Sequence, residues 1–330
     1  MTTALWLVII ITFLAWIYDF YNGANDCANS IATTVSSRVL SPTKAIILAA
    51  VFNTVGAFIS TEVAKTIGKG LLPENLMTTA VLVSAIIGAI AWSAYATHAG
   101  LPVSITHSII GGIFGAGLVA YGFGAFKLQI FKKIVIAMIT SPIFGFLIGL
   151  FLLAAIFWLF KKHQVKLVNK MFGKLQLVSA SFMALTHGMN DTQNSMGIIT
   201  ASLLAGGFIG SFEVPTWVIL FSSLIMGLGT FYGGKKVIKT MGMKMTKIRP
   251  VEGFAAETSA SIVIFIASLL GLPISTTHVI STSIMGVGSV KRFSAVRWGV
   301  AKEVLVAWLL TIPAAALVSA GVYFMIERLS

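Results

Sequence analysis

Long apolar stretches, separated by short polar connections, make up most of this chain. They lie at about 4–20 (continuing through 25–37), 43–60, 76–97, 103–123, 134–160, 175–206, 216–233, 254–270, 273–289 and 298–326. A helix of roughly 20 apolar residues spans a bilayer, and several of these stretches reach or approach that length. The pattern predicts an all-α polytopic membrane protein with about 10–12 transmembrane segments, some of them broken.

The composition supports the membrane class. Hydrophobic residues make up 57% of the chain and charged residues 10%, against about 25% charged residues in soluble domains. The 23 basic and 10 acidic residues give a net charge of +13, but the basic residues cluster between apolar stretches. This distribution is typical of positive cytoplasmic loops and argues against nucleic-acid binding. A single cysteine and the lack of a metal-ligand Cys/His spacing exclude zinc chemistry, so we expect no bound cofactor.

A basic segment divides the chain near its middle. Residues 161–174 contain five lysines and no acidic residue. We expect a cytoplasmic linker at 161–174 between a first transmembrane repeat (1–160) and a second one (175–330). The protein is then a multi-pass protein of the plasma membrane.

Two polar phrases occur twice, in the same order, about half the chain length apart. Asn-Asp-Cys-Ala-Asn at 25–29 returns as Asn-Asp-Thr-Gln-Asn at 190–194, and Leu-Pro-Val-Ser-Ile-Thr-His at 101–107 returns as Leu-Pro-Ile-Ser-Thr-Thr-His at 272–278. A third pair, 63–68 and 237–242, lies in loops of different charge. The first loop has balanced charges, whereas residues 235–249 include six basic residues and no acidic one. Because basic loops stay in the cytoplasm, the equivalent loops would lie on opposite sides, which indicates an inverted repeat.

The crossing count does not yet fit this inversion. An inverted repeat requires an odd number of crossings in each half, but treating each second-phrase segment as re-entrant gives four. One of the segments 4–37, 101–124 or 134–160 therefore has to be interpreted differently.

The first phrase has the chemistry of a cation site. An Asp at the centre of a membrane helix costs at least roughly 2.5–3.5 kcal/mol and survives where it faces a wet cavity or a cation. Glycine lets the helix open, and freed carbonyls, the carboxylate and Asn side-chain oxygens together suit a hard cation such as Na⁺. Alternatively, these amides only hold helices together. Since Asn22 stands where the second copy has His187, we expect no symmetric ligand role for this histidine.

The second phrase has the chemistry of an anion site. Its proline suits the first turn of a helix, and the hydroxyls that follow lie beside exposed N–H groups at that end. We expect a re-entrant hairpin with its tip near the midplane, and the alternative is a Pro-kinked spanning helix. His107 and His278 are expected to stabilise the tips by donating to backbone carbonyls, with proton transfer as the alternative.

Three further features lie outside the phrases. Glu257 is another acid within an apolar stretch, for which a coupling role and a structural role are equally open. The pairs Gly111-x-x-x-Gly115 and Gly145-x-x-x-Gly149 indicate close helix packing.

Electrostatics favours coupled transport. Asp26 and Asp191 are expected to lie near one another, next to helix N-termini and hydroxyls that suit an oxyanion. A dianion about 5 Å from a carboxylate is repelled by roughly 6–7 kcal/mol at an effective dielectric constant of ~20. Anion binding therefore requires cations between the charges, or protonated carboxylates, and this requirement favours symport.

At these residues the chain resembles the inorganic phosphate transporter (PiT) family, whose two halves carry a Gly-x-Asn-Asp-x-x-Asn type signature. The resemblance covers essentially all 330 residues. It implies an all-helical inverted-repeat carrier with two re-entrant hairpins that moves phosphate with Na⁺ or H⁺. Two departures are Ile105, where the second copy has Thr276, and the short basic linker, where many relatives have a long cytoplasmic domain.

The resemblance also implies site residues. The cation-binding residues would be Asn25, Asp26, Asn190 and Asp191, with Na⁺ at Asp26 and Asp191. The phosphate-binding residues would be Asn29, Ser104, Thr106, Asn194, Ser275, Thr276 and Thr277.

We therefore expect a secondary active transporter that imports phosphate by symport with cations, Na⁺ favoured over H⁺, by alternating access around a midplane site. Its partners would be phosphate, the coupling ion, the lipid bilayer and, as one option, further copies of the chain. The alternatives are a sulfate:cation symporter, an anion channel and an intramembrane enzyme with Asp26 and Asp191 as an aspartyl dyad.

Overall fold

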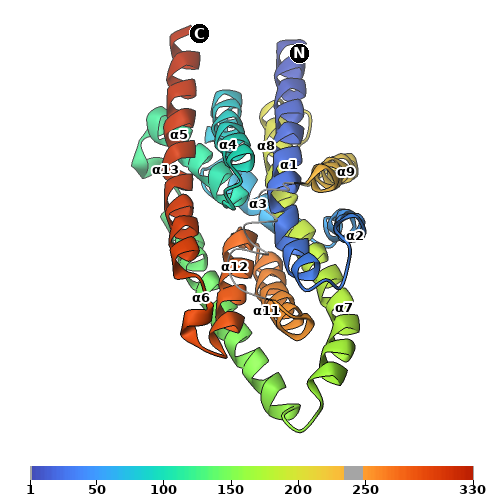
Figure 1. Ribbon diagram of the computed structural model, residues 1–330. Helices are drawn as coiled ribbons and strands as arrows, with labels where there is room; N and C mark the ends of the chain where they lie inside the picture. Colours follow the sequence, from blue (N-terminus) through green and yellow to red (C-terminus); the bar gives the residue numbers. More distant parts are fainter. Residues whose placement is uncertain (1, 234–247, 330) are drawn as a thin grey trace.

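The computed structural model describes residues 2–233 and 248–329, and these ranges are helical with no β-strand (Figure 1). The α-helices are α1 (Thr2–Ser36), α2 (Pro42–Gly56), α3 (Glu62–Lys69), α4 (Thr79–Ala99), α5 (Ile105–Tyr121), α6 (Leu128–Leu159), α7 (Val165–Asp191), α8 (Gln193–Ala205), α9 (Thr216–Tyr232), α11 (Pro250–Leu269), α12 (Thr276–Ser289) and α13 (Trp298–Leu329). Short 3₁₀-helices are η1 (Glu74–Leu76), η2 (Phe123–Ala125) and η4 (Phe293–Ala295).

The helices have the length and exposed surface of a membrane protein. Among the described residues, α1, α4, α6, α11 and α13 are long and apolar enough to cross a bilayer, and α2, α5 and α9 are shorter apolar helices. Large apolar side chains face outward. Leu309 and Leu317 on α13 are 77% and 75% exposed, which suits contact with lipid chains. The predicted all-α polytopic class is confirmed.

Two helical hairpins meet near the middle of the molecule. In Figure 1, α4 and α5 lie in the upper part beside α13, and α11 and α12 lie in the lower part between α6 and α7. Their tips, residues 100–104 and 270–275, come together, because the rings of His107 and His278 are 4.7 Å apart. The hairpins predicted for the second phrases are thus present, and they approach the centre from opposite ends of the molecule (Figure 1).

The position of α4 bears on the crossing count. Both termini lie at the top of Figure 1 and the connection between α6 and α7 lies at the bottom, so the first half runs from one end to the other. Because α4 is the first arm of a hairpin, the apolar helices of this half outside the hairpin are α1, the shorter α2 and α6, which would give an odd number of crossings. Segment 76–97, which was not among the three suspected from the sequence, is therefore the one that the structure places in a hairpin, and the number of crossings stays a prediction.

The first phrase does not open its helix, contrary to the expectation from its glycine. α1 is continuous through residues 22–30, and α7 and α8 are separated only by Thr192, which keeps helical angles (φ −63°, ψ −25°). The glycines serve close packing instead. A Cβ on Gly23 would lie 2.2 Å from the carbonyl oxygen of Met226 in α9, and one on Gly188 would lie 2.0 Å from that of Asn53 in α2. Side chains rather than freed carbonyls therefore carry the polar chemistry of this phrase.

Each hairpin packs against a long helix of the other half of the chain. A Cβ on Gly115 in α5 would lie 2.1 Å from the carbonyl oxygen of Ala316 in α13. A Cβ on Gly145 in α6 would lie 2.8 Å from that of Val279 in α12. The close helix packing predicted for both glycine pairs is confirmed.

Two expectations about the halves remain predictions. The loop comparison behind the inverted repeat depends on residues 237–242 and most of 235–249, which lie outside the described residues. In the proposed linker at 161–174, α7 begins at Val165, so most of that segment is helical.

Candidate functional site

The hairpin tips bring two helix N-termini together. Ser104 and Ser275 are the N-caps of α5 and α12, and their hydroxyl oxygens accept from the backbone N–H of His107 and His278, each at 3.1 Å. The remaining first-turn N–H groups of both helices face the same region, where the helix dipoles place partial positive charge. Such a pair of termini suits an anion.

The two tip histidines pack against each other rather than bonding to the backbone. Their rings meet edge to face at 88°, and His278 also stacks on Trp308 of α13 with 3.8 Å between ring centroids. No hydrogen bond from either imidazole to a backbone carbonyl occurs among the described residues, so the expected donor role is corrected. Aromatic packing stabilises these tips, and Trp308 reinforces it by donating to the carbonyl of Pro102 at 3.1 Å.

Asp26 and Asp191 lie together, as predicted, but they share a third residue. His187 Nε2 is 3.2 Å from Asp191 Oδ2 and 3.7 Å from Asp26 Oδ2, and all three side chains are buried. One ligand atom from each of them lies within 4.8 Å of the others, a grouping that could hold a metal ion. The ring is held from behind, where His187 Nδ1 lies 3.0 Å from Asn53 Oδ1.

The second tip contacts both carboxylates. Thr276 donates to Asp191 Oδ2 at 2.9 Å, and Thr277 donates to Asp26 Oδ1 at 3.1 Å. The amide nitrogen of Asn29 donates to both threonine hydroxyls, at 3.2 and 3.0 Å. Ile105, which stands where the second copy has Thr276, is buried in the hydrophobic core. The sequence difference between the tips is therefore an asymmetry in how they hold the aspartates.

The first tip repeats only part of this arrangement. Asn194 donates to the hydroxyl of Thr106 at 2.9 Å, which corresponds to the contact between Asn29 and Thr277. Among the described residues no contact joins Thr106 to a carboxylate. The first tip therefore keeps its threonine hydroxyl proton available for another acceptor.

Asn25 and Asn190 connect the first phrases to the first arms of the hairpins. Asn25 donates to Thr97 at 3.0 Å and to the carbonyl of Leu101 at 3.2 Å. The amide of Asn190 lies 2.9 Å from the hydroxyl of Ser268, the corresponding position on α11. These contacts hold the α4–α5 hairpin against α1, which carries Asn25, and the α11–α12 hairpin against α7, which carries Asn190.

Several amide oxygens at the centre have no protein partner. The side-chain oxygens of Asn25, Asn29 and Asn194 are buried and accept no hydrogen bond within residues 2–233 and 248–329. A buried acceptor without a partner costs about 1–3 kcal/mol. Together with the two carboxylates, these oxygens form the hard-ligand set that Na⁺ prefers. Of the residues predicted for cation binding, Asp26, Asp191 and Asn25 thus have suitable oxygen atoms. The unpartnered oxygens of Asn29 and Asn194 belong to residues predicted for phosphate, and Asn25 and Asn190 also brace the hairpins.

Two buried titratable residues near the centre were not predicted as site residues. His187 was set aside because the first copy has Asn22 at its position, a symmetry argument that fails since the centre itself is asymmetric. Asp19 was overlooked although it is an acid inside the first apolar stretch, which is a sufficient signal on its own. It is fully buried and accepts from Ser195 at 2.5 Å.

Glu257 lies away from the aspartates in a pocket of donors. Its carboxylate accepts from Thr33 (2.5 Å), Thr34 (2.9 Å) and Gln176 (3.0 Å), and from Ser179. Two of the donors lie on α1 and two on α7. The carboxylate of Glu257, which lies on α11, therefore connects α11 to both of these helices. The geometry accommodates both roles left open by the sequence.

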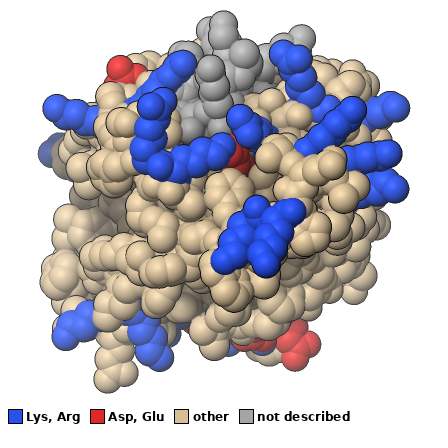
Figure 2. All heavy atoms as spheres, turned by 60° about the horizontal axis from the view of Figure 1, so that its bottom comes forward, with Lys and Arg blue, Asp and Glu red and all other residues tan. Residues whose placement is uncertain are grey.

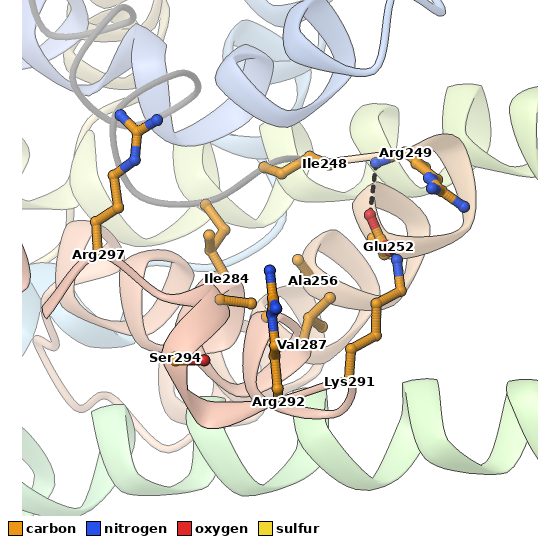
Figure 3. A pocket seen from close by; sticks show the side chains of 12 residues that line it. Ile248, Arg249, Glu252, Ala256, Ile284, Val287, Lys291, Arg292, Ser294 and Arg297 are labelled. Atoms are coloured by element: carbon orange, nitrogen blue, oxygen red, sulfur yellow. Dashed lines mark hydrogen bonds and ion pairs between the residues drawn. The ribbon is translucent and has the colours of Figure 1, made fainter.

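One face of the molecule is strongly basic. Figure 2 shows Lys and Arg gathered on the face that includes the bottom of Figure 1, with few acidic side chains. This face includes a cavity of about 370 Å³ at the base of α11 and α12, lined by Arg249, Lys291, Arg292, Arg297 and a single acid, Glu252 (Figure 3). Glu252 is engaged by Lys291 and by the backbone N–H of Arg249. A neighbouring cavity joins Arg249 to Lys161, so the basic linker lies on the same face.

Comparisons with known proteins agree with this architecture. Residues 22–319 match the model of the Phosphate transporter family. The chain is 44% identical to a probable low-affinity inorganic phosphate transporter of Rhizobium meliloti, over 98% of this chain and 97% of that one. It is also 44% identical to a protein of the same description from Bacillus subtilis, over 98% of each chain.

A solved structure described as the sodium-dependent phosphate transporter superposes with a TM-score of 0.90 at 28% identity, covering 98% of this chain and all of that one. The matched proteins are transporters, which leaves the aspartyl-dyad enzyme without support. The resemblance found in the repeated phrases is therefore confirmed, and the chain belongs to the phosphate transporter family.

Proposed function

We propose that this protein is a secondary active transporter of the plasma membrane that imports inorganic phosphate by symport with cations, Na⁺ favoured over H⁺. Family membership supports the substrate, and the solved relative is by its title sodium-dependent. The observation that carries the proposal is local. Two helix N-termini suited to an anion lie directly beside two buried carboxylates, which a phosphate group approaches only if their charge is neutralised.

The site residues divide into two sets. Asp26 and Asp191, together with Asn25 and Asn190, hold Na⁺ on the side of the first phrases. Phosphate binds at the tips, where it accepts from the hydroxyls and first-turn N–H groups. The phosphate-binding residues are Asn29, Ser104, Thr106, Asn194, Ser275, Thr276 and Thr277. The free hydroxyl proton of Thr106 supports the phosphate set, and the unpartnered amide oxygen of Asn25 supports the Na⁺ set.

His187 gives the centre a defined need for positive charge. Asn53 donates its amide N–H to Thr230 at 3.0 Å, so its oxygen accepts from Nδ1–H of His187. A neutral His187 then directs the lone pair of Nε2 at Asp191, an acceptor facing an acceptor. The arrangement is favourable when Nε2 or a carboxylate carries a proton, or when a cation lies between them. Na⁺ and H⁺ therefore compete for one role at this centre.

The hairpins are the moving parts of the proposed alternating access. Their tips contact each other at the centre, so phosphate reaches bulk water only when one tip moves away from the other. Because basic loops remain in the cytoplasm, the face with the linker and the basic cavity is assigned to the cytoplasmic side. The α4–α5 hairpin then controls access from outside.

The test is uptake of labelled phosphate into proteoliposomes, with Na⁺, pH and competing sulfate varied in turn. We expect accumulation above the external concentration that depends on an inward Na⁺ gradient and is lost in Asp26→Asn. Glu213→Gln, in an exposed loop acid, is the matched control. Equilibration without accumulation would indicate a channel. Stronger inhibition by sulfate than by unlabelled phosphate would identify a sulfate carrier, and a pH gradient that suffices without Na⁺ would identify H⁺ as the coupling ion.

A further inference from the structure

Asp19 is a buried carboxylate that the proposed site does not use. It lies on α1 seven residues before Asp26, which is two helical turns or about 10 Å along the axis. The threonines that contact Glu257, Thr33 and Thr34, lie seven and eight residues beyond Asp26 on the same helix. Asp19 and Glu257 therefore lie on opposite sides of the core site, by which we mean Asp26, His187 and Asp191. Asp19 is on the side toward the end of the molecule where the N-terminus lies (Figure 1).

The surroundings of Asp19 leave a negative charge poorly compensated. The side chain is 0% exposed, and its Oδ2 accepts from Ser195 at 2.5 Å. The Ser195 hydroxyl lies 3.2 Å from that of Ser222 on α9. The other carboxylate oxygen, Oδ1, has no hydrogen-bond partner within the described ranges. A buried carboxylate with one donor is costly when ionised and inexpensive when protonated.

Within the described residues, the helix segments that hydrogen-bond around Asp19 carry no basic side chain. The sequences of α1, α8 and α9 contain no Lys, Arg or His, so no fixed positive charge comes from the helices that touch it. The ionisable groups on the elements packed around this part of α1 are Tyr18, Tyr21 and Asp26 on α1, His187 and Asp191 at the end of α7, Tyr95 and His98 near the end of α4, His107 at the start of α5, Lys44 at the start of α2, and Tyr232 at the end of α9.

The geometry favours a proton over Na⁺ at this position. The distance of 2.5 Å between Asp19 Oδ2 and Ser195 Oγ leaves no room for an ion between these atoms. Na⁺ requires several oxygens, whereas the hydrogen-bonded group around Asp19 offers the side-chain oxygens of Asp19, Ser195 and Ser222. A proton on the carboxyl group removes the buried charge without any further ligand.

Ser195 also links Asp19 to the core site. It lies on α8 one turn after Asp191, directly after the second copy of the first phrase. Its hydroxyl has one proton and three acceptors in reach: Asp19 at 2.5 Å, the carbonyl of Thr192 at 3.0 Å and Ser222 at 3.2 Å. A movement of the chain around Thr192, the residue after Asp191, therefore changes which acceptor this hydroxyl uses.

We infer that Asp19 binds one proton from the N-terminal side and releases it to the linker side in each transport cycle, in addition to the cations at Asp26 and Asp191. This inference rests on the proposed symport. The proton adds to the carboxylate oxygen on loading and leaves to water on release, so no other reactant is involved. Phosphate uptake then consumes one proton beyond those bound to the phosphate itself.

The test measures protons and phosphate together. Proteoliposomes contain a pH-sensitive dye, and proton uptake per labelled phosphate is compared for wild type, Asp19→Asn and Asp19→Glu at saturating Na⁺. We expect Asp19→Asn to take up one proton fewer per phosphate and Asp19→Glu to keep the wild-type ratio. The protonation of phosphate is the same for all three proteins and cancels in the comparison.

Two outcomes overturn the inference. One is an equal proton-to-phosphate ratio in wild type and Asp19→Asn. The other is an unchanged ratio with an altered Na⁺ dependence, which would make Asp19 part of a Na⁺ site. If the wild type transports no phosphate, the proposed function fails instead, and this result is distinct from either outcome.

A measurement on the wild type covers the case in which Asp19→Asn does not fold. Hydrophobic carbodiimides modify protonated carboxyl groups in apolar surroundings, and peptide mass spectrometry locates the product. We expect modification at Asp19 that falls as pH rises. Absence of modification at every pH at which the protein transports phosphate would overturn the inference.

Discussion

The asparagine substitution of Asp191 tests the coupling argument most directly, because it is expected to change two affinities in opposite directions. One ligand atom each from Asp26, His187 and Asp191 lies within 4.8 Å of the others. Two unit charges at that separation interact by at least about 3.5 kcal/mol at an effective dielectric constant of ~20. In Asp191→Asn, a cation at this centre loses that attraction, which corresponds to an about 300-fold higher half-saturating Na⁺ concentration. Phosphate loses a repulsion of the same origin, so its affinity in Na⁺-free buffer increases.

The assay is binding of labelled phosphate to the purified protein in detergent. Na⁺ is titrated against choline at constant ionic strength, so that screening stays fixed. Glu213→Gln, which removes one exposed negative charge, is the control and should behave as wild type. A half-saturating Na⁺ concentration within a few-fold of wild type would refute the placement of Na⁺ at these carboxylates. Weaker phosphate binding without Na⁺ would refute the repulsion argument even if Na⁺ dependence changed.

Three other substitutions test separate parts of the structure. Gly188→Ala forces α2 and α7 apart and should destabilise the protein by roughly 1–3 kcal/mol in thermal unfolding, whereas Gly173→Ala, with an open site, should leave the melting temperature unchanged. Thr276→Val removes the hydroxyl that donates to Asp191 and should weaken phosphate-coupled Na⁺ binding by about 10-fold or more, since hydrogen bonds to charged groups contribute about 1.5–3 kcal/mol. Glu257→Gln should lower the melting temperature alone if its role is structural, and unchanged stability with altered Na⁺ dependence of uptake would contradict that role.

The repeated phrases predicted much of the centre for a physical reason. Polar residues in an apolar chain are costly unless they meet one another, so Asp26, Asp191 and the tip hydroxyls could be brought together from sequence alone. The hairpins followed from proline next to hydroxyls, and the missing hydroxyl at Ile105 correctly indicated an asymmetry.

The errors have a physical origin too. Gly23 was expected to open its helix, but a glycine that permits a close helix contact has the same sequence pattern, and only the neighbouring helix decides between them. His187 was excluded by comparing the two halves of the chain. The two aspartates that it contacts, however, come one from each half. Asp19 lies outside both phrases, and its contact with Ser195 spans 176 positions, so only the folded chain brings them together.

The packing of each hairpin on a helix of the other half has a consequence for the order in which the protein assembles during synthesis. The first hairpin packs on α13, the last helix of the chain, and α1 packs closely on α9. Between α13 and α5 of the first hairpin, the hydroxyl of Ser319 donates to the carbonyl of Gly112 at 2.7 Å. During synthesis the first hairpin is therefore complete in sequence long before its packing surface exists. A chain that ends before α13 lacks the helix on which the first hairpin packs. The central anion site can therefore be completed only after the final helix has been synthesised.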